Sequence, residues 1–100
     1  MRVRANATDF GLDPNKCPYV LRRAWRVQGW HGYKIGDSVE YLDPATALHS
    51  AHYPWVRGEI AAIGTHAEDY SGQSLVIFAI KGEDATVRCK THRDVIPIVE

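Results

Sequence analysis

The alternation of apolar and polar residues predicts short β-strands in the second half of the chain. Residues 38–42 place Val39 and Tyr41 between polar side chains directly after a Gly-Asp turn, which is typical of a half-buried strand. Residues 55–63 form a second such segment, in which Gly58 indicates a bulge or the close approach of another backbone. Residues 75–80 are the most apolar and most β-prone run, and they predict the central strand.

Two further segments complete this pattern. Residues 85–90 alternate apolar and polar side chains, and residues 95–99 form a last short strand. Pro97 confines that strand to a sheet edge, because proline has no N–H to donate to a ladder. Residues 64–74 are polar and predict a loop before the central strand. Four or five antiparallel strands joined by turns predict a small barrel, since closure removes exposed edges.

The first 32 residues carry a different pattern. Residues 1–5 predict a short edge strand, and a turn-rich stretch follows it. Residues 18–30 fit either a short helix ending at Gly29 or a strand that alternates apolar residues with arginines. The alternation breaks at Ala24, which favours the helix. We therefore predict an N-terminal extension, residues 1–32, which carries a short helix and packs on a barrel formed by residues 33–100.

Composition is that of an ordinary folded domain. Apolar residues make up 45% of the 100 residues and charged residues 24%, which excludes wholesale disorder. The longest apolar run is far shorter than the roughly 20 residues of a membrane span, and the N-terminus lacks an apolar signal segment. Cys17 and Cys89 are too few for a disulfide scaffold. We expect a soluble intracellular protein, nuclear or cytoplasmic, without contact to a membrane.

Charge is distributed unevenly along the chain. Residues 1–34 carry seven basic and two acidic side chains, a net +5, and the remainder carries five basic and ten acidic ones, a net −5. Guanidinium groups bind phosphates and aromatic rings stack on unpaired bases, so this segment predicts a nucleic-acid surface as one alternative. Attraction between the two halves of the chain is the other alternative. The candidate nucleic-acid contacts are Arg22, Arg23, Trp25, Arg26 and Trp30.

Four sequence pieces, in their order and spacing, resemble a known group of domains. They are YKIGDSVEYLD, YPWVRGEIAAI, LVIFAI and THRDVIPI, and the resemblance covers residues 33–100. In this order they resemble the Tudor, Agenet and PWWP group of SH3-like barrels, with HYPWVRGEI similar to the PWWP signature strand. The resemblance implies a mainly β fold: an SH3-like barrel of about five antiparallel strands.

The resemblance also implies a binding site at the barrel mouth. Domains of this group hold a methylated lysine or arginine in an aromatic cage, because ring faces attract an organic cation. The sequence departs from that pattern at Val56 and Lys81, which stand where further rings are often found. Trp55 and Phe78 also fit burial in a core, where large aromatic residues are common. The candidate ligand-binding residues are Tyr41, Tyr53, Trp55 and Phe78.

These observations favour a binding module over an enzyme. The chain has no nucleophile elbow, no phosphate-binding loop and no other recognisable catalytic motif, so we expect no catalytic residue and no cofactor. His49, His52, Cys89 and His92 have poor spacing for zinc, so no metal is expected. We expect a non-enzymatic module that binds a protein segment, a methylated histone-type tail on chromatin being one such ligand. The alternatives are a structural subunit or assembly adaptor, or a nucleic-acid-binding domain.

Overall fold

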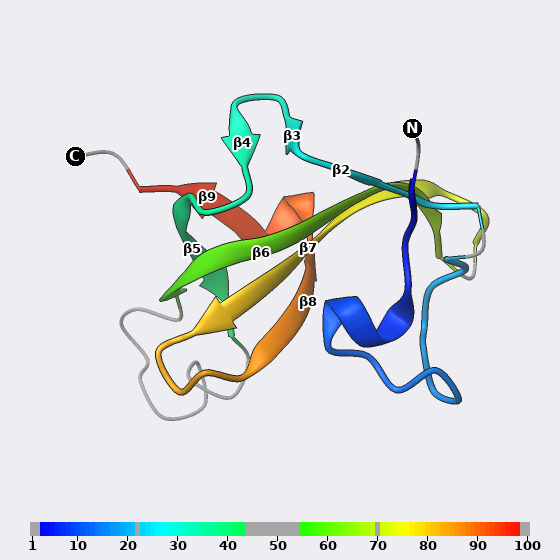
Figure 1. The fold of residues 1–100 in the computed structure, drawn as a ribbon, viewed down its shortest axis with the longest axis horizontal. Coiled ribbons are helices and arrows are strands. Elements are labelled where there is room, and N and C mark those ends of the chain that lie inside the picture. Colours follow the sequence, from blue (N-terminus) through cyan, green and yellow to red (C-terminus); the bar gives the residue numbers. More distant parts are fainter. Residues whose placement is uncertain (1–2, 22, 44–54, 70, 99–100) are drawn as a thin grey trace.

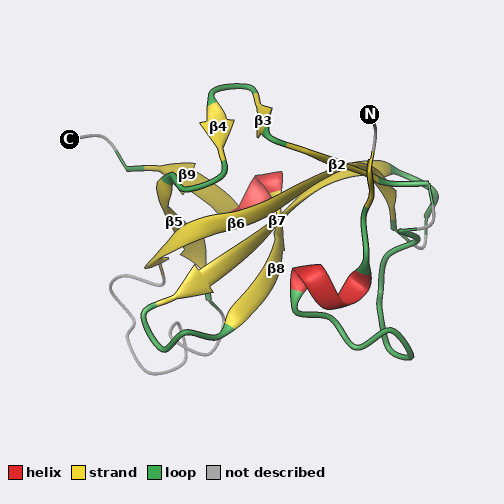
Figure 2. Ribbon diagram, in the orientation of Figure 1, coloured by secondary structure: helices red, strands yellow, loops and turns green. Residues whose placement is uncertain are grey.

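A computed structural model of the protein describes residues 3–21, 23–43, 55–69 and 71–98. This part of the chain is mainly β-sheet with antiparallel pairing between neighbouring strands (Figure 1, Figure 2). None of its helices has the length and apolar character needed to cross a membrane. The elements are β1 (Val3–Arg4), η1 (Ala7–Phe10), β2 (Trp25–Val27), β3 (Gly29–Trp30), β4 (Tyr33–Lys34), β5 (Ser38–Leu42), β6 (Trp55–Glu68), β7 (Ser74–Gly82), β8 (Val87–Thr91), η2 (His92–Asp94) and β9 (Val95–Pro97).

Strand β6 organises the sheet. Along one edge it pairs with β7, and along the other edge it pairs first with β5 and then with β2. β7 pairs with β6 on one side and β8 on the other, so residues 75–80 lie in an interior strand as predicted, although β6 has more partners. β6 also runs on to Glu68 through residues predicted as a loop. Partners from the N-terminal extension explain this length, because β2 and an isolated bridge at Val20 pair with its polar end.

Hydrophobic residues form two clusters, one on each face of the β6–β7 pair. The first cluster joins the extension to the sheet and contains Ala5, Phe10, Leu21, Ala24, Ala62, Ala67, Ile77 and Ala79. The second cluster lies under β5 and β9 and contains Val39, Tyr41, Ile60, Ile63, Phe78, Ile80 and Val95. A strand with both faces covered needs apolar side chains at successive positions, which explains the unbroken apolar run in β7.

An irregularity in β6 lets this strand serve both clusters. Ile60 pairs with Ile80 and Ala62 with Ala79, so Ala61 has no partner in the register and is exposed. The extra residue shifts the alternation, because a β-bulge places two residues opposite one. Ile60 and Ile63, three positions apart, therefore both face the second cluster.

The predicted helix over residues 18–29 is wrong. The described part of this segment contains strand β2, which pairs with β1 and β6, while the short helix of the extension is the 3-10 helix η1. The apolar alternation breaks at Ala24 because this residue is itself buried in the first cluster, where its carbonyl accepts a hydrogen bond from the Ala5 amide. Partner strands from elsewhere in the chain thus decide the conformation of residues 25–27.

The sheet edges are partly as predicted. β1 is an edge strand, and β9 with Pro97 pairs only with β5, which confirms both edge assignments. The described strands β9, β5, β6, β7 and β8 are hydrogen-bonded neighbours in that order, and no described sheet closes on itself. The division of the chain at residue 32 stays a prediction.

Gly58 confirms the expected close approach of another backbone. A Cβ atom there would lie 2.5 Å from Ile80 Cγ2 and 3.0 Å from both the Lys81 carbonyl oxygen and Tyr41 Cε1. We expect Gly58→Ala to lower the free energy of unfolding by about 1–3 kcal/mol, because overpacking forces neighbours to shift. Urea unfolding measures this loss. The exposed neighbour variant Glu59→Ala should stay within about 0.5 kcal/mol of wild type, and an equally stable Gly58→Ala protein would contradict the packing.

Phe10 tests whether the extension is part of the core. Its side chain is 0% exposed in the first cluster, although the predicted barrel begins more than twenty residues later. We expect Phe10→Ala to cost about 3–5 kcal/mol, as other buried Phe truncations do. Val3→Ala is the control, since Val3 is exposed at the sheet edge. If Phe10→Ala has the same thermal unfolding midpoint as the wild-type protein, the extension does not stabilise the sheet.

Candidate functional site

A pocket lies where β5 ends and β6 begins, beside the turn between β7 and β8. Its volume is about 230 Å³. Tyr41 and Val56 are direct partners in the β5–β6 register, so their side chains share one face of the sheet and form its apolar wall. The lining residues are Tyr41, Asp43, Val56, Glu83, Asp84 and Arg88. Of the four predicted ligand-binding residues, Tyr41 lines this pocket.

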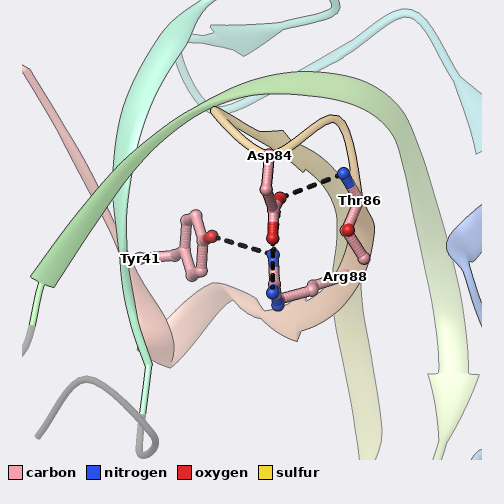
Figure 3. A network of polar contacts seen from close by, with 4 residues as sticks. All are labelled: Tyr41, Asp84, Thr86 and Arg88. Atoms are coloured by element: carbon pink, nitrogen blue, oxygen red, sulfur yellow. Dashed lines mark hydrogen bonds and ion pairs between the residues drawn. The ribbon is translucent and has the colours of Figure 1, made fainter.

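A polar network holds Arg88 in place within this pocket (Figure 3). Its guanidinium donates to both carboxylate oxygens of Asp84, with Nη2 at 3.0 Å from Oδ2 and Nη1 at 3.3 Å from Oδ1. Nη1 also lies 3.4 Å from the Tyr41 hydroxyl, which points at Arg88 from β5. The network therefore joins β5 to β8, two strands that are not neighbours in the sheet.

The turn between β7 and β8 sets the position of Asp84. Its carboxylate accepts a hydrogen bond from the Thr86 amide at 3.0 Å, an Asx turn of the kind that aspartate favours. Ala85 has φ +65°, and its amide donates to the Gly82 carbonyl at 3.0 Å. This tight turn brings the carboxylate beside the residue four positions later, Arg88.

Hydrogen bonding and burial shift the pKa values of the network. The hydrogen bond from Arg88, with help from the Thr86 amide, lowers the pKa of Asp84 to about 2. The same bond raises the pKa of Arg88. Burial raises the pKa of Tyr41, so its hydroxyl stays protonated at neutral pH. The pocket wall then carries three formal negative charges, on Asp43, Glu83 and Asp84, and one positive charge on Arg88.

The three predicted ring residues that the structure describes do not gather around this pocket. Tyr41 lines it, but its side chain is 1% exposed, and Lys90 Nζ lies 5.8 Å from its ring centroid. Phe78 is 0% exposed in the second cluster. Trp55 pairs with Leu42 and so lies on the opposite face of the sheet from Tyr41. Tyr53 lies outside the described residues.

Phe78 instead belongs to an aromatic group that holds the β3–β4 hairpin on the sheet. The Phe78 ring centroid lies 6.1 Å from that of Trp30 and 5.1 Å from that of Tyr33. His92 in η2 approaches Trp30 at 5.6 Å, and the Tyr33 hydroxyl donates to the Val95 carbonyl at 3.4 Å. These rings pack against one another, which explains the half-buried state of Trp30.

The predicted nucleic-acid surface is divided between two faces. Arg4 stacks on Trp25, with its Cζ 3.9 Å from the ring centroid. Arg26 points to the other face, where its Nη1 lies 3.4 Å from Asp9 Oδ2. Arg23 is exposed, Arg22 lies outside the described residues, and Trp30 packs in the aromatic group. The structure therefore does not bring these residues together as one surface.

Sequence reasoning missed the polar half of the pocket. Asp84 and Arg88 carry a local signal, because an Asx turn followed by an arginine at the fourth position predicts an ion pair across a tight turn. Nothing local indicates that Tyr41 would join them from β5. Among the described residues no group of three or more His, Cys, Asp or Glu could hold a metal ion, and His49 and His52 lie outside that part of the chain.

Comparisons of the chain with protein-family models, with curated proteins and with solved structures gave no match. The function of the pocket is therefore argued from its geometry and charge.

The Arg88–Asp84 pair predicts a pH dependence. An unfolded aspartate has a pKa of about 3.9. Because the pKa of Asp84 is lower in the folded protein, the ionised carboxylate stabilises the fold, and this stabilisation is complete above about pH 4. It is lost as pH falls through about 2. Carboxyl chemical shifts in an NMR titration should give a pKa of about 2 for Asp84. Arg88→Ala should raise this pKa toward its ordinary value, whereas Arg93→Ala should leave it unchanged. An Asp84 pKa that is the same in Arg88→Ala and wild type would contradict the pair.

Proposed function

We propose that the protein is a non-enzymatic recognition module built on an SH3-like barrel. The strand order β9, β5, β6, β7, β8 supports this architecture, because consecutive strands are neighbours and β9 returns to pair with β5. The 3-10 helix η2 turns the chain from β8 into β9 within the piece THRDVIPI, one of the four that resemble the Tudor, Agenet and PWWP group. The second cluster lies inside this curved sheet. Because one fold can carry many functions, the likeness to Tudor-type domains does not identify a ligand, and the proposal for the ligand rests on the pocket.

The ligand that we propose is a segment of another protein with a basic side chain. One observation carries this proposal: three carboxylates and a single guanidinium line the pocket, and that guanidinium is already paired with Asp84. An entering lysine or arginine would be attracted by this net negative charge, reach the Glu83 carboxylate and place its methylene groups against Val56. Long basic side chains suit such a wall, because their stems are apolar and their heads charged.

Charge, rather than a ring cage, is the basis of the proposed recognition. A cage attracts methylated ammonium groups through exposed ring faces, and the Tyr41 ring is almost completely covered. The pocket should therefore bind unmethylated and methylated basic segments with similar affinity. A methylated histone-type tail on chromatin remains one candidate among such segments.

Binding of labelled lysine- and arginine-rich peptides, followed by fluorescence anisotropy, tests the proposal. We expect saturable binding that weakens as salt increases, because exposed charge pairs are screened. The double variant Asp43→Asn, Glu83→Gln should weaken binding by about tenfold, since each exposed pair contributes about 0.2–1 kcal/mol. The matched control is Glu59→Gln, an exposed acidic residue of β6 that does not line the pocket. Equal affinities in the double variant and wild type would remove the pocket from the proposal.

A structural subunit or assembly adaptor is the second candidate function. Four apolar side chains are well exposed among the described residues, and Ile96 lies on the edge strand β9. Blank peptide arrays combined with a partner that co-purifies at fixed stoichiometry would favour this function over recognition. A nucleic-acid function has weaker support, because Arg26 is paired with Asp9 and the basic side chains lie on two faces.

A further inference from the structure

The two cysteines of the chain lie against the same hydrophobic cluster. Cys17 belongs to the extension and Cys89 to β8, and both are half-buried residues packed on the first cluster. Cys89 pairs with Ala79 in the β7–β8 register, so its side chain shares a face with a member of that cluster. The two thiols are 72 positions apart in the sequence, and both pack against the first cluster.

The C-terminal end of η1 lies against the start of β8. Gly11, which ends η1 with φ +71°, packs so closely that a Cβ atom there would lie 2.3 Å from the Val87 carbonyl oxygen. Figure 1 shows η1 beside β8, at the side of the sheet where the extension lies. Tyr19 packs against the same cluster as both cysteines, and burial, followed by charge on Cys89, raises the pKa of its phenol. The Cys17 thiol donates to the Tyr19 carbonyl, with Sγ 3.3 Å from the oxygen.

We propose that Cys17 and Cys89 are a redox pair, which a small disulfide such as oxidised glutathione converts reversibly into a disulfide bond between the extension and β8. The Cys17 thiolate attacks one sulfur of oxidised glutathione, forming a mixed disulfide and releasing one glutathione thiolate. The Cys89 sulfur then attacks the Cys17 sulfur and releases the second glutathione. The protein loses two electrons and two protons, and one oxidised glutathione becomes two reduced molecules.

The surroundings of the two thiols assign the order of these steps. Burial raises the pKa of Cys89 to about 12, with a further contribution from Cys17, so Cys89 holds little thiolate at neutral pH. Residues 13–16 directly before Cys17 are exposed, which gives an oxidant access to that side of the pair. Cys17 therefore reacts first and Cys89 completes the bond.

The bond would attach the extension to the strand that carries one wall of the pocket. Arg88 and Lys90 flank Cys89 and point to the other face of β8, toward Tyr41. A closed loop of this length restricts the unfolded chain strongly. We therefore expect oxidation to stabilise the whole sheet and not only the extension.

The test equilibrates the folded protein with glutathione buffers, blocks free thiols by alkylation and measures intact mass. We expect one intramolecular disulfide, reversed by dithiothreitol, and a thermal midpoint about 10 °C higher in the oxidised protein. The bond should also be favoured at least about tenfold more in the folded protein than in the same chain in urea, because folding holds the thiols together.

Two variants separate the pair from incidental oxidation. Cys17→Ala keeps the buried Cys89 and should show neither the bond nor the rise in midpoint, with its fold checked by circular dichroism. Cys89→Ala should accumulate a mixed disulfide at Cys17, which identifies Cys17 as the first site. A wild-type protein that stops at a mixed disulfide, or that forms the bond no more readily folded than in urea, would overturn the proposal.

Discussion

The β6–β7 ladder is covered on both faces, and the rest of the structure depends on this constraint. Apolar side chains of β7 alternate between two clusters, and β6 follows them through register shifts at Ala61 and between Gly64 and Ala67. Without the first shift Ile63 would turn to the wrong face, since a shift of one position inverts the side chains that follow. Both faces of the ladder must then be covered, and two different parts of the 100-residue chain cover them.

The extension provides one of these covers and the curved strands β5 and β9 provide the other. Phe10, Leu21 and Ala24 close the first cluster, so the N-terminal residues are part of the hydrophobic core rather than an appendage. The strand faces are thus used for stability. The proposed binding site lies at the strand ends, where the turn at Asp84 and the end of β5 bring polar groups together around a pocket. Connecting turns on a rigid sheet are a common place for binding residues.

Much of the fold could be predicted from the sequence, and less of the candidate site. Strand β5 has the expected bounds, and Pro97 lies on an edge strand, because two-residue alternation and the missing proline N–H are local properties. Tyr41 lines a pocket, while the predicted binding mouth itself stays a prediction. Aromatic residues suggested a cage, whereas burial removes Phe78 from it and strand alternation turns Trp55 away. Burial depends on which segments cover a ring, and no local pattern contains that information.

The sequence by itself determined the mainly β character, the bounds of β5 and the tight turn that brings Asp84 to Arg88, since these follow from alternation, turn chemistry and short spacing. Tertiary structure alone decided that residues 25–27 extend β6 rather than form a helix, that Tyr41 meets Arg88, and that Cys17 and Cys89 share a cluster. Such contacts join residues that are distant in sequence, and their free energy exceeds the weak preferences of each segment for one conformation.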